Sequence, residues 1–246
     1  MRIVATVSCL FVAVPVMADN VRLAIAANFT AAGEQLIQQF EKTTGHSVKA
    51  SYGSTGKLFA QINNGAPYDV LLSADEATVI KLEALALAVA GSRFTYAHGT
   101  LMLWSAKANM FNNPEHYLQA AQYAHLAIAN PNTAPYGAAA QQVLQQLGVW
   151  ATVQNKLVQG DSIAQAFQFV ATENAEAGFV ARSQVLAWKH SGSSWEIPQH
   201  YYQPIIQQAA LLQPGKNHPA AQAFLNYLQT AAAKKIIRDF GYGVDE

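Results

Sequence analysis

The sequence predicts an α/β fold made of two lobes. Short apolar runs typical of buried strands alternate with helical patterns along nearly the whole chain, an order that indicates sheets covered by helices. Two extended apolar stretches, residues 93–105 and 204–212, are candidates for crossings between the lobes. Further helical patterns follow the second stretch, so we expect the chain to end by packing back on the first lobe.

Periodicity and turn residues give the expected elements in order. The first lobe should contain strands at residues 21–26, 47–52 and 69–73, and helices at 31–43, from Gly56 to the stop at Gly65, and at 76–87. The second lobe should contain a strand at 126–129, a helix at 136–147 that ends at Gly148, a helix at 161–172, a strand at 178–181 and a surface loop at 190–194. Helices at 219–228 and 231–240 then return to the first lobe. The predicted boundaries are 19–97 for lobe 1, 98–205 for lobe 2 and 206–246 for the rest of lobe 1.

Residues 1–18 have the pattern of a secretory signal peptide. Met1 and Arg2 precede an apolar run at residues 3–14, and Ala18 ends a segment of the type that signal peptidase cleaves. The run is too short to span a bilayer. We therefore expect cleavage after Ala18 and a periplasmic protein; the alternative interpretation is a buried N-terminal strand.

Composition excludes several classes of site and partner. Cys9, the single cysteine, lies inside the predicted leader, so a mature chain would have neither a disulfide nor a cysteine-ligated metal. Lys and Arg together number 15, as do Asp and Glu, a balance that argues against nucleic acid or anionic lipid as a partner.

Motifs of enzymes are missing from the sequence. It contains no G-x-S-x-G elbow, no H-E-x-x-H, no P-loop and no G-x-G-x-x-G. Its seven histidines are scattered singly, which is typical of surface residues and not of a metal site. We therefore predict a non-enzymatic protein with no catalytic residues and no cofactor. A secreted hydrolase that uses Ser54 or Ser73 with an unrecognised base is an alternative from another class.

Small or polar residues stand at four predicted strand-to-helix junctions. These are Ala27-Asn28, Ser54-Thr55, Pro135-Tyr136-Gly137 and Asp161-Ser162-Ile163, with two junctions in each lobe. The Ser54-Thr55 turn, Asn28 and Asp161 can alternatively be read as ordinary helix caps. Lys57, one turn into its helix, can be read as a solvent-facing side chain. Four helix starts facing one another would instead surround a small anion with N–H and hydroxyl donors. Such a cage has no acceptor for a proton on its ligand and therefore disfavours hydrogen phosphate.

At these junctions the chain resembles the periplasmic molybdate-binding proteins that serve ABC importers. The resemblance runs over essentially the whole mature chain. Its strongest blocks are residues 26–29 (AANF), 53–56 (GSTG), 65–70 with 72–76, 134–137 (APYG) and 219–242.

The resemblance implies a type II periplasmic-binding-protein fold in which two lobes close on molybdate or tungstate, with molybdenum present only as the oxyanion. It assigns ligand binding to Asn28, to the Thr55 hydroxyl with Ser54 as a second candidate, and to the backbone amides of Tyr136 and Ile163. It also implies a monomer that delivers its ligand to the membrane permease of an ABC importer. Ala181 stands where some members of the family have Tyr.

Other oxyanions remain open as ligands. The same fold holds other solutes, so a binding protein for sulfate or chromate is the first alternative. An adhesive or structural domain is disfavoured because such folds are usually rich in β-structure.

Overall fold

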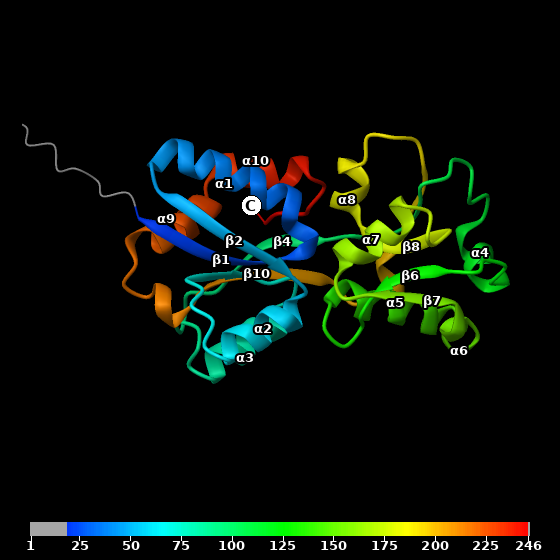
Figure 1. Cartoon of the computed structure of the whole chain (residues 1–246), viewed down its shortest axis with the longest axis horizontal. Helices are drawn as coiled ribbons and strands as arrows, with labels where there is room; N and C mark the ends of the chain where they lie inside the picture. Colours follow the sequence, from blue (N-terminus) through cyan, green and yellow to red (C-terminus); the bar gives the residue numbers. More distant parts are fainter. Residues whose placement is uncertain (1–18, 246) are drawn as a thin grey trace, which may run out of the picture.

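The computed structural model describes residues 19–245, and the predicted signal peptide lies outside the described residues. The chain forms two α/β lobes, each built on a five-stranded sheet (Figure 1). The strand order is β2-β1-β3-β10-β4 in the first sheet and β7-β6-β8-β5-β9 in the second. The predicted two-lobed α/β class is therefore confirmed.

The first lobe contains segments from both ends of the described chain. Its strands are β1 (Asn20–Ala26), β2 (Ser47–Gly53), β3 (Val70–Leu72), β4 (Phe94–Gly99) and β10 (Ile205–Leu211). Its helices are the 3-10 turn η1 (Ala27–Phe29), α1 (Thr30–Thr44), α2 (Thr55–Asn63), α3 (Glu76–Ala84), η4 (Gln213–Gly215), α9 (Pro219–Leu228) and α10 (Ala231–Asp239).

Alternate side chains of the first sheet enter two separate cores. Leu23 and Ile25 of β1 pack with α1, α9 and α10, whereas Ala24 packs with α2 and α3. Successive residues of a strand point to opposite faces of the sheet. Because both the odd and the even positions are apolar here, helices must cover both faces. Figure 1 shows this layering, and it confirms that the C-terminal helices return to the first lobe.

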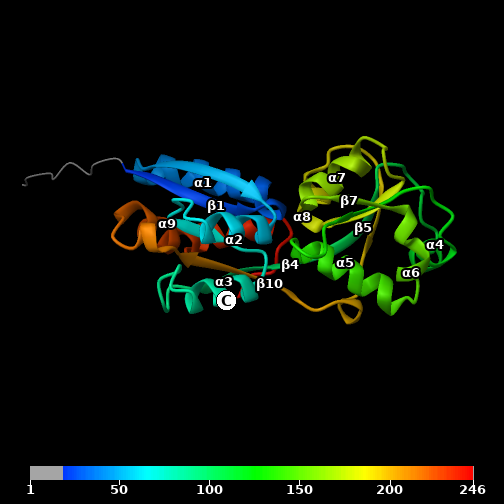
Figure 2. The same cartoon turned by 60° about the horizontal axis from the view of Figure 1, so that its bottom comes forward.

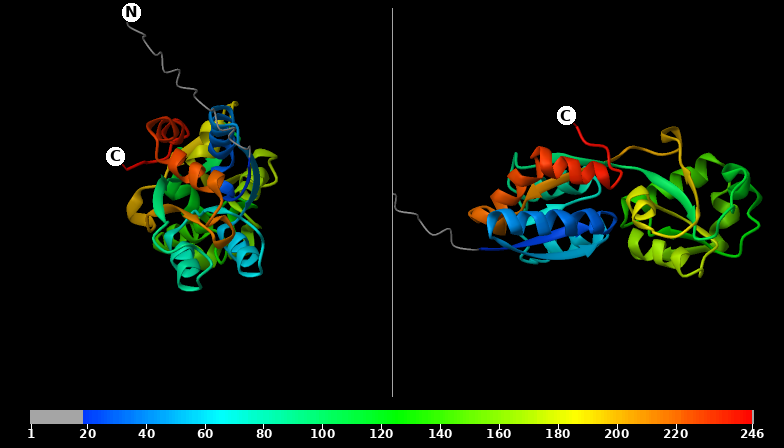
Figure 3. Two further views of the ribbon diagram at one scale, coloured as in Figure 1. Left: turned by 90° about the vertical axis from the view of Figure 1, so that its left-hand side faces the viewer. Right: turned by 90° about the horizontal axis from the view of Figure 1, so that it is seen from above.

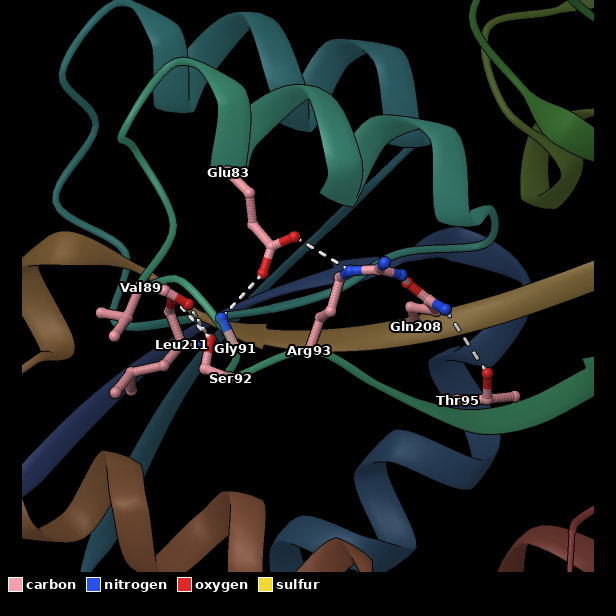
Figure 4. Close-up of polar contacts among 8 residues, drawn as sticks. All are labelled: Glu83, Val89, Gly91, Ser92, Arg93, Thr95, Gln208 and Leu211. Carbon is pink, nitrogen blue, oxygen red and sulfur yellow. Dashed lines mark hydrogen bonds and ion pairs between the residues drawn. The ribbon is translucent and has the colours of Figure 1, made fainter.

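A polar network holds β4 against β10 and α3. The Arg93 side chain lies between Glu83 of α3 (Nε to Oε2, 2.9 Å) and Gln208 of β10 (Nη1 to Oε1, 3.0 Å), as Figure 4 shows. The pairing of β10 with β4 skips Tyr96, because Gln207 pairs with Ala97 and Gln208 with Thr95. Such a bulge redirects a side chain, and Tyr96 here contacts Gln207 (3.1 Å, Oη to Oε1).

The second lobe occupies the middle of the chain. Its strands are β5 (Leu101–Ser105), β6 (Leu126–Ala129), β7 (Leu157–Gly160), β8 (Ala177–Ala181) and β9 (Ser193–Glu196). Its helices are α4 (Pro114–Ala120), α5 (Pro135–Gln146), α6 (Trp150–Val153), η2 (Gln154–Lys156), α7 (Ile163–Ala171), α8 (Arg182–Ala187) and η3 (Gln199–Tyr201). Figure 2 shows α5 and α7 on opposite sides of this sheet.

Two connections pass between the lobes and form the hinge, defined here as residues 99–101 and 197–204. The first runs directly from β4 into β5, and the second leads from β9 to β10 through the turn η3. Gly99 pairs with Ile205, so the two connections lie side by side where they enter the first sheet. The lobes and their connections are seen from above in Figure 3.

Several sequence predictions need correction. The predicted surface loop at 190–194 runs into β9, whose Ser193 pairs with Ser105 of β5. The helix expected to reach residue 87 ends at Ala84, and α7 begins at Ile163 after the cap Ser162, two residues later than predicted. Within residues 19–245, no helix combines the length and apolarity needed to cross a membrane.

Candidate ligand-binding site

The site lies where parallel strands of both sheets end. β1 is parallel to β2 and β3, and β6 is parallel to β7 and β8, so each sheet collects the carboxyl ends of its parallel strands at one edge. In α/β sheets this edge is the usual place for ligands. η1, α2, α5 and α7 follow such strands, and the two edges face each other across the hinge.

The four helix starts line one small pocket between the lobes. All five predicted residues contribute to it: Asn28, Ser54 and Thr55 from the first lobe, and Tyr136 and Ile163 from the second. The remaining lining residues are small or apolar, namely Ala26, Ala27, Gly53, Ala74, Ala134 and Pro135. The structure therefore brings the four junctions together. This convergence could not be predicted from the sequence alone.

Backbone amides at the helix starts are available to a ligand. The first N–H groups of a helix have no acceptor inside the helix. The N–H groups of Thr55, Tyr136 and Ile163 donate to no backbone carbonyl among residues 19–245. With helix dipoles adding partial positive charge, these donors suit an anion.

Ser54 and Thr55 present hydroxyl groups at the same pocket. Ser54 is the N-cap of α2 but makes no capping bond, and its buried Oγ has no partner in the described part of the chain. Thr55 Oγ1 accepts the N–H of Ala74 at 3.1 Å, which leaves its own proton free to donate. The interpretation of Ser54 as an ordinary side-chain cap is therefore wrong.

Asn28 is oriented by a buried hydrogen-bond network. Its Nδ2 donates to Gln207 Oε1 (2.9 Å) and to Tyr242 Oη (3.2 Å). Tyr96 also donates to Gln207 Oε1, and the Tyr242 hydroxyl donates its proton to the Asn28 carbonyl (2.6 Å). These bonds keep Gln207 Oε1 and Tyr242 Oη turned toward the Asn28 amide group as acceptors. The side chain caps no helix. Both amide protons and the backbone carbonyl of Asn28 are used behind the pocket, which leaves the Asn28 backbone N–H for the ligand.

The lining residues carry no charge, and this limits the chemistry of the ligand. The pocket has hydroxyl and N–H donors but no carboxylate or histidine to accept a proton. Hydrogen bonds to an ionised acceptor are worth about 1.5–3 kcal/mol each, so several neutral donors can hold a dianion. Burial raises the pKa of the Tyr136 phenol well above its usual value, so this side chain stays neutral as well.

Lys57 is exposed to solvent, as predicted, and its Nζ also lies 2.6 Å from Asp161 Oδ2 in the other lobe. The predicted role of Asp161 as a cap is wrong, since Ser162 is the N-cap of α7. Ala181 is fully buried and does not line the pocket; its N–H donates to Gln184 Oε1 at 2.9 Å.

Sequence reasoning missed the residues that support the pocket from behind. Gln207 and Tyr242 orient Asn28, and the Ser183 hydroxyl donates to the Asn28 carbonyl from the other lobe at 3.0 Å. Gln207 could have been noticed as a polar residue within an apolar strand pattern. Ser183 carries no such signal.

Comparisons with known proteins agree on the class. Residues 21–243 match the model of the family described as bacterial extracellular solute-binding protein. The molybdate-binding protein ModA of Azotobacter vinelandii is 50% identical over 99% of this chain and 97% of its own length. ModA of Rhodobacter capsulatus is 47% identical over 94% of this chain and 90% of its own.

Solved structures give the same fold. The periplasmic molybdate-binding protein of Azotobacter vinelandii matches with a TM-score of 0.88 at 42% identity, covering 92% of this chain and all (100%) of that one. The sulfate-binding protein SubI of Mycobacterium tuberculosis H37Rv has a TM-score of 0.75 at 15% identity, covering 92% and 87%. The relatives named here are binding proteins, in agreement with the prediction of a non-enzymatic protein. The chain belongs to the bacterial extracellular solute-binding protein family.

Proposed function

We propose that this protein captures molybdate in the periplasm and delivers it to the membrane permease of an ABC importer. The observation that carries the proposal is the convergence of four helix starts on one uncharged pocket. The names of the two ModA relatives, similar over nearly the full chain, point to the same ligand. Tungstate has the same shape and charge, so it should bind as well.

The ligand shell consists of neutral donors from both lobes. The Thr55 hydroxyl, with Ser54 beside it, binds from the first lobe together with the backbone at Asn28. The backbone amides of Tyr136 and Ile163 bind from the second. A fully ionised tetrahedral oxyanion satisfies these donors without bringing a proton that lacks an acceptor.

Closure of the lobes couples capture to a change of shape. The ligand would contact both lobes, so its binding favours the closed arrangement over any open one. Bonds between the lobes support this, including the Gly56 N–H to the Thr133 carbonyl (2.8 Å) and Ser183 to Asn28. The permease would then distinguish loaded from empty protein by shape, and a monomer suffices for this.

Sulfate is the second candidate because it too is a fully ionised tetrahedral dianion, and chromate shares this chemistry. The pocket's set of donors suits either anion. These anions differ from molybdate in size, so a comparison of their affinities for the protein distinguishes them as ligands.

Calorimetric titration of the mature protein with molybdate, tungstate, sulfate and phosphate tests the proposal. We expect tight binding of the first two and weak or no binding of the others. Equal binding of sulfate would change the assigned ligand, and no binding of any oxyanion would refute the proposal.

A matched pair of variants tests the shell. Thr55→Val keeps the shape but loses a charge-assisted hydrogen bond, so molybdate should bind about tenfold more weakly or worse. Thr43→Val is the control, because Thr43 is exposed on α1 and bonds only to carbonyls of its own helix. An unchanged affinity in Thr55→Val would remove this hydroxyl from the shell.

A further inference from the structure

Tyr136 connects the pocket to the hinge. Its backbone lies at the start of α5 and lines the pocket, whereas its side chain, 1% exposed, reaches the first connection between the lobes. A Cβ placed on Gly99 would lie only 2.2 Å from Tyr136 Oη and 3.0 Å from Gln207 Nε2. The phenol therefore occupies the space that a side chain at residue 99 would take.

Gly99 provides room here and not an unusual backbone conformation. Its φ is not among the positive values, which in glycines occur at residues 45, 65, 91, 148 and 241. Alanine could therefore adopt the same backbone, and what opposes it is close contact, most of all with Tyr136 and less with Gln207. Close approach of another group is the second common reason for glycine at a fixed place.

Close packing against Gly99 locates the phenol. Tyr136 Oη and Gln207 Nε2 are both buried without a partner among the described residues. Tyr96 and Asn28 donate to the Gln207 oxygen and hold this side chain in place. The phenol thus rests against a fixed surface formed by Gly99 and Gln207, which we call the phenol seat.

We propose that Gly99 is a positioning residue for ligand binding. With no side chain at residue 99, the phenol seat accepts Tyr136, and this contact sets the position of the α5 start, including the Tyr136 N–H, relative to the first lobe. The inference rests on the proposed function, because it concerns the placement of one donor of that pocket.

Gly99→Ala tests this role by calorimetric titration with molybdate. The added methyl group displaces the phenol, so we expect affinity to fall by about tenfold or more. Tyr136→Phe, which keeps the backbone donor and removes only the phenol oxygen, is measured alone as the reference for the double variant. The double variant Gly99→Ala/Tyr136→Phe removes the oxygen nearest the new methyl group and should recover most of the lost affinity.

Matched controls separate positioning from general destabilisation. Gly33→Ala places a methyl group no closer than 3.5 Å to its neighbours in α1 and should leave affinity unchanged. If Gly99→Ala folds poorly, Tyr136→Leu empties the phenol seat from the other side, keeps the N–H, and should weaken binding by about tenfold. Thermal unfolding of each variant without ligand verifies that it is folded.

The outcomes are distinct. If the unaltered protein fails to bind molybdate, the proposed function fails first. If it binds and Gly99→Ala or Tyr136→Leu binds equally well, the positioning role is overturned. Failure of the double variant to recover any affinity would also overturn it, since the Tyr136 oxygen, which at 2.2 Å is the atom nearest the new methyl group, would then not carry the loss.

Discussion

Lys57 Nζ of the first lobe lies 2.6 Å from Asp161 Oδ2 of the second. The two side chains flank the pocket, because Lys57 follows Thr55 on α2 and Asp161 precedes Ile163 at α7. Both are largely exposed, at 49% and 70%, so the pair contributes little energy in solvent. The ion pair nevertheless joins the two lobes, so the proposed opening of the lobes would break it.

We predict that Lys57→Met releases molybdate up to about fivefold faster, because exposed ion pairs are worth roughly 0.2–1 kcal/mol. Asp161→Asn should have the same effect although it changes the charge in the opposite direction. Stopped-flow dissociation at low and high salt is the measurement. Lys107→Met is the control, since Lys107 pairs with Glu173 inside the second lobe at 3.4 Å. Slower release by Asp161→Asn would indicate a general field effect and contradict the cross-lobe contact.

Gly56 of the first lobe lies directly against the backbone of Thr133 in the second, to whose carbonyl its N–H donates at 2.8 Å. A Cβ there would lie 3.0 Å from the Thr133 carbonyl oxygen. Gly56→Ala should therefore hold the lobes slightly apart and cost about 1 kcal/mol, or roughly fivefold in molybdate affinity. Small-angle scattering at saturating molybdate should show a larger radius of gyration for the variant than for the unaltered protein. A variant with unaltered affinity would mean that this contact does not limit closure.

Asn28→Asp tests the network behind the pocket. A carboxylate would turn acceptors toward Gln207 Oε1 and add negative charge beside the bound dianion, so affinity should fall by about a hundredfold or more. Asn226→Asp changes net charge equally on the exposed side of α9 and serves as the control. Calorimetric titration at neutral pH measures both. A loss below about threefold would mean that the Asn28 side chain and its network do not influence the bound anion.

Alkaline pH should destabilise the protein through buried tyrosines. Burial raises the pKa of the phenols of Tyr96, Tyr136 and Tyr242 above the ordinary value of 10.0. It raises the pKa of Tyr123 in the second lobe to about 12. Their contribution to stability is complete below about pH 10 and is lost as pH rises toward the folded-state values, since only the unfolded chain releases protons there. Urea unfolding at a series of pH values should give a free energy that falls above about pH 10. A constant free energy through that range would contradict the burial of these phenols.

Most of the fold could be predicted from local patterns. The run at 126–129 and the helix at 219–228 have the bounds expected from the sequence, because apolar residues there show their burial directly. β7 and β9 were missed. The two strands lie at the edges of the second sheet and are only partly buried, so their pairing depends on neighbouring strands more than on their own composition.

The helix starts that form the site could be predicted from the sequence, but their positions relative to one another could not. Ser54, Thr55 and Tyr136 are recognisable from small residues at helix starts, because this chemistry is local. The distance between the lobes is not local, and neither is the contact of Tyr136 with Gly99 or of Lys57 with Asp161. Such relationships appear only when the chain has folded.

The position of molybdenum in crystals grown with molybdate, found from its anomalous scattering, tests the proposed pocket most sharply. We expect one strong peak in the pocket, with the molybdate oxygens within hydrogen-bonding range of Thr55 Oγ1 and of the backbone amides of Tyr136 and Ile163. A peak elsewhere on the molecule, or an empty pocket at saturating molybdate, would contradict the proposal.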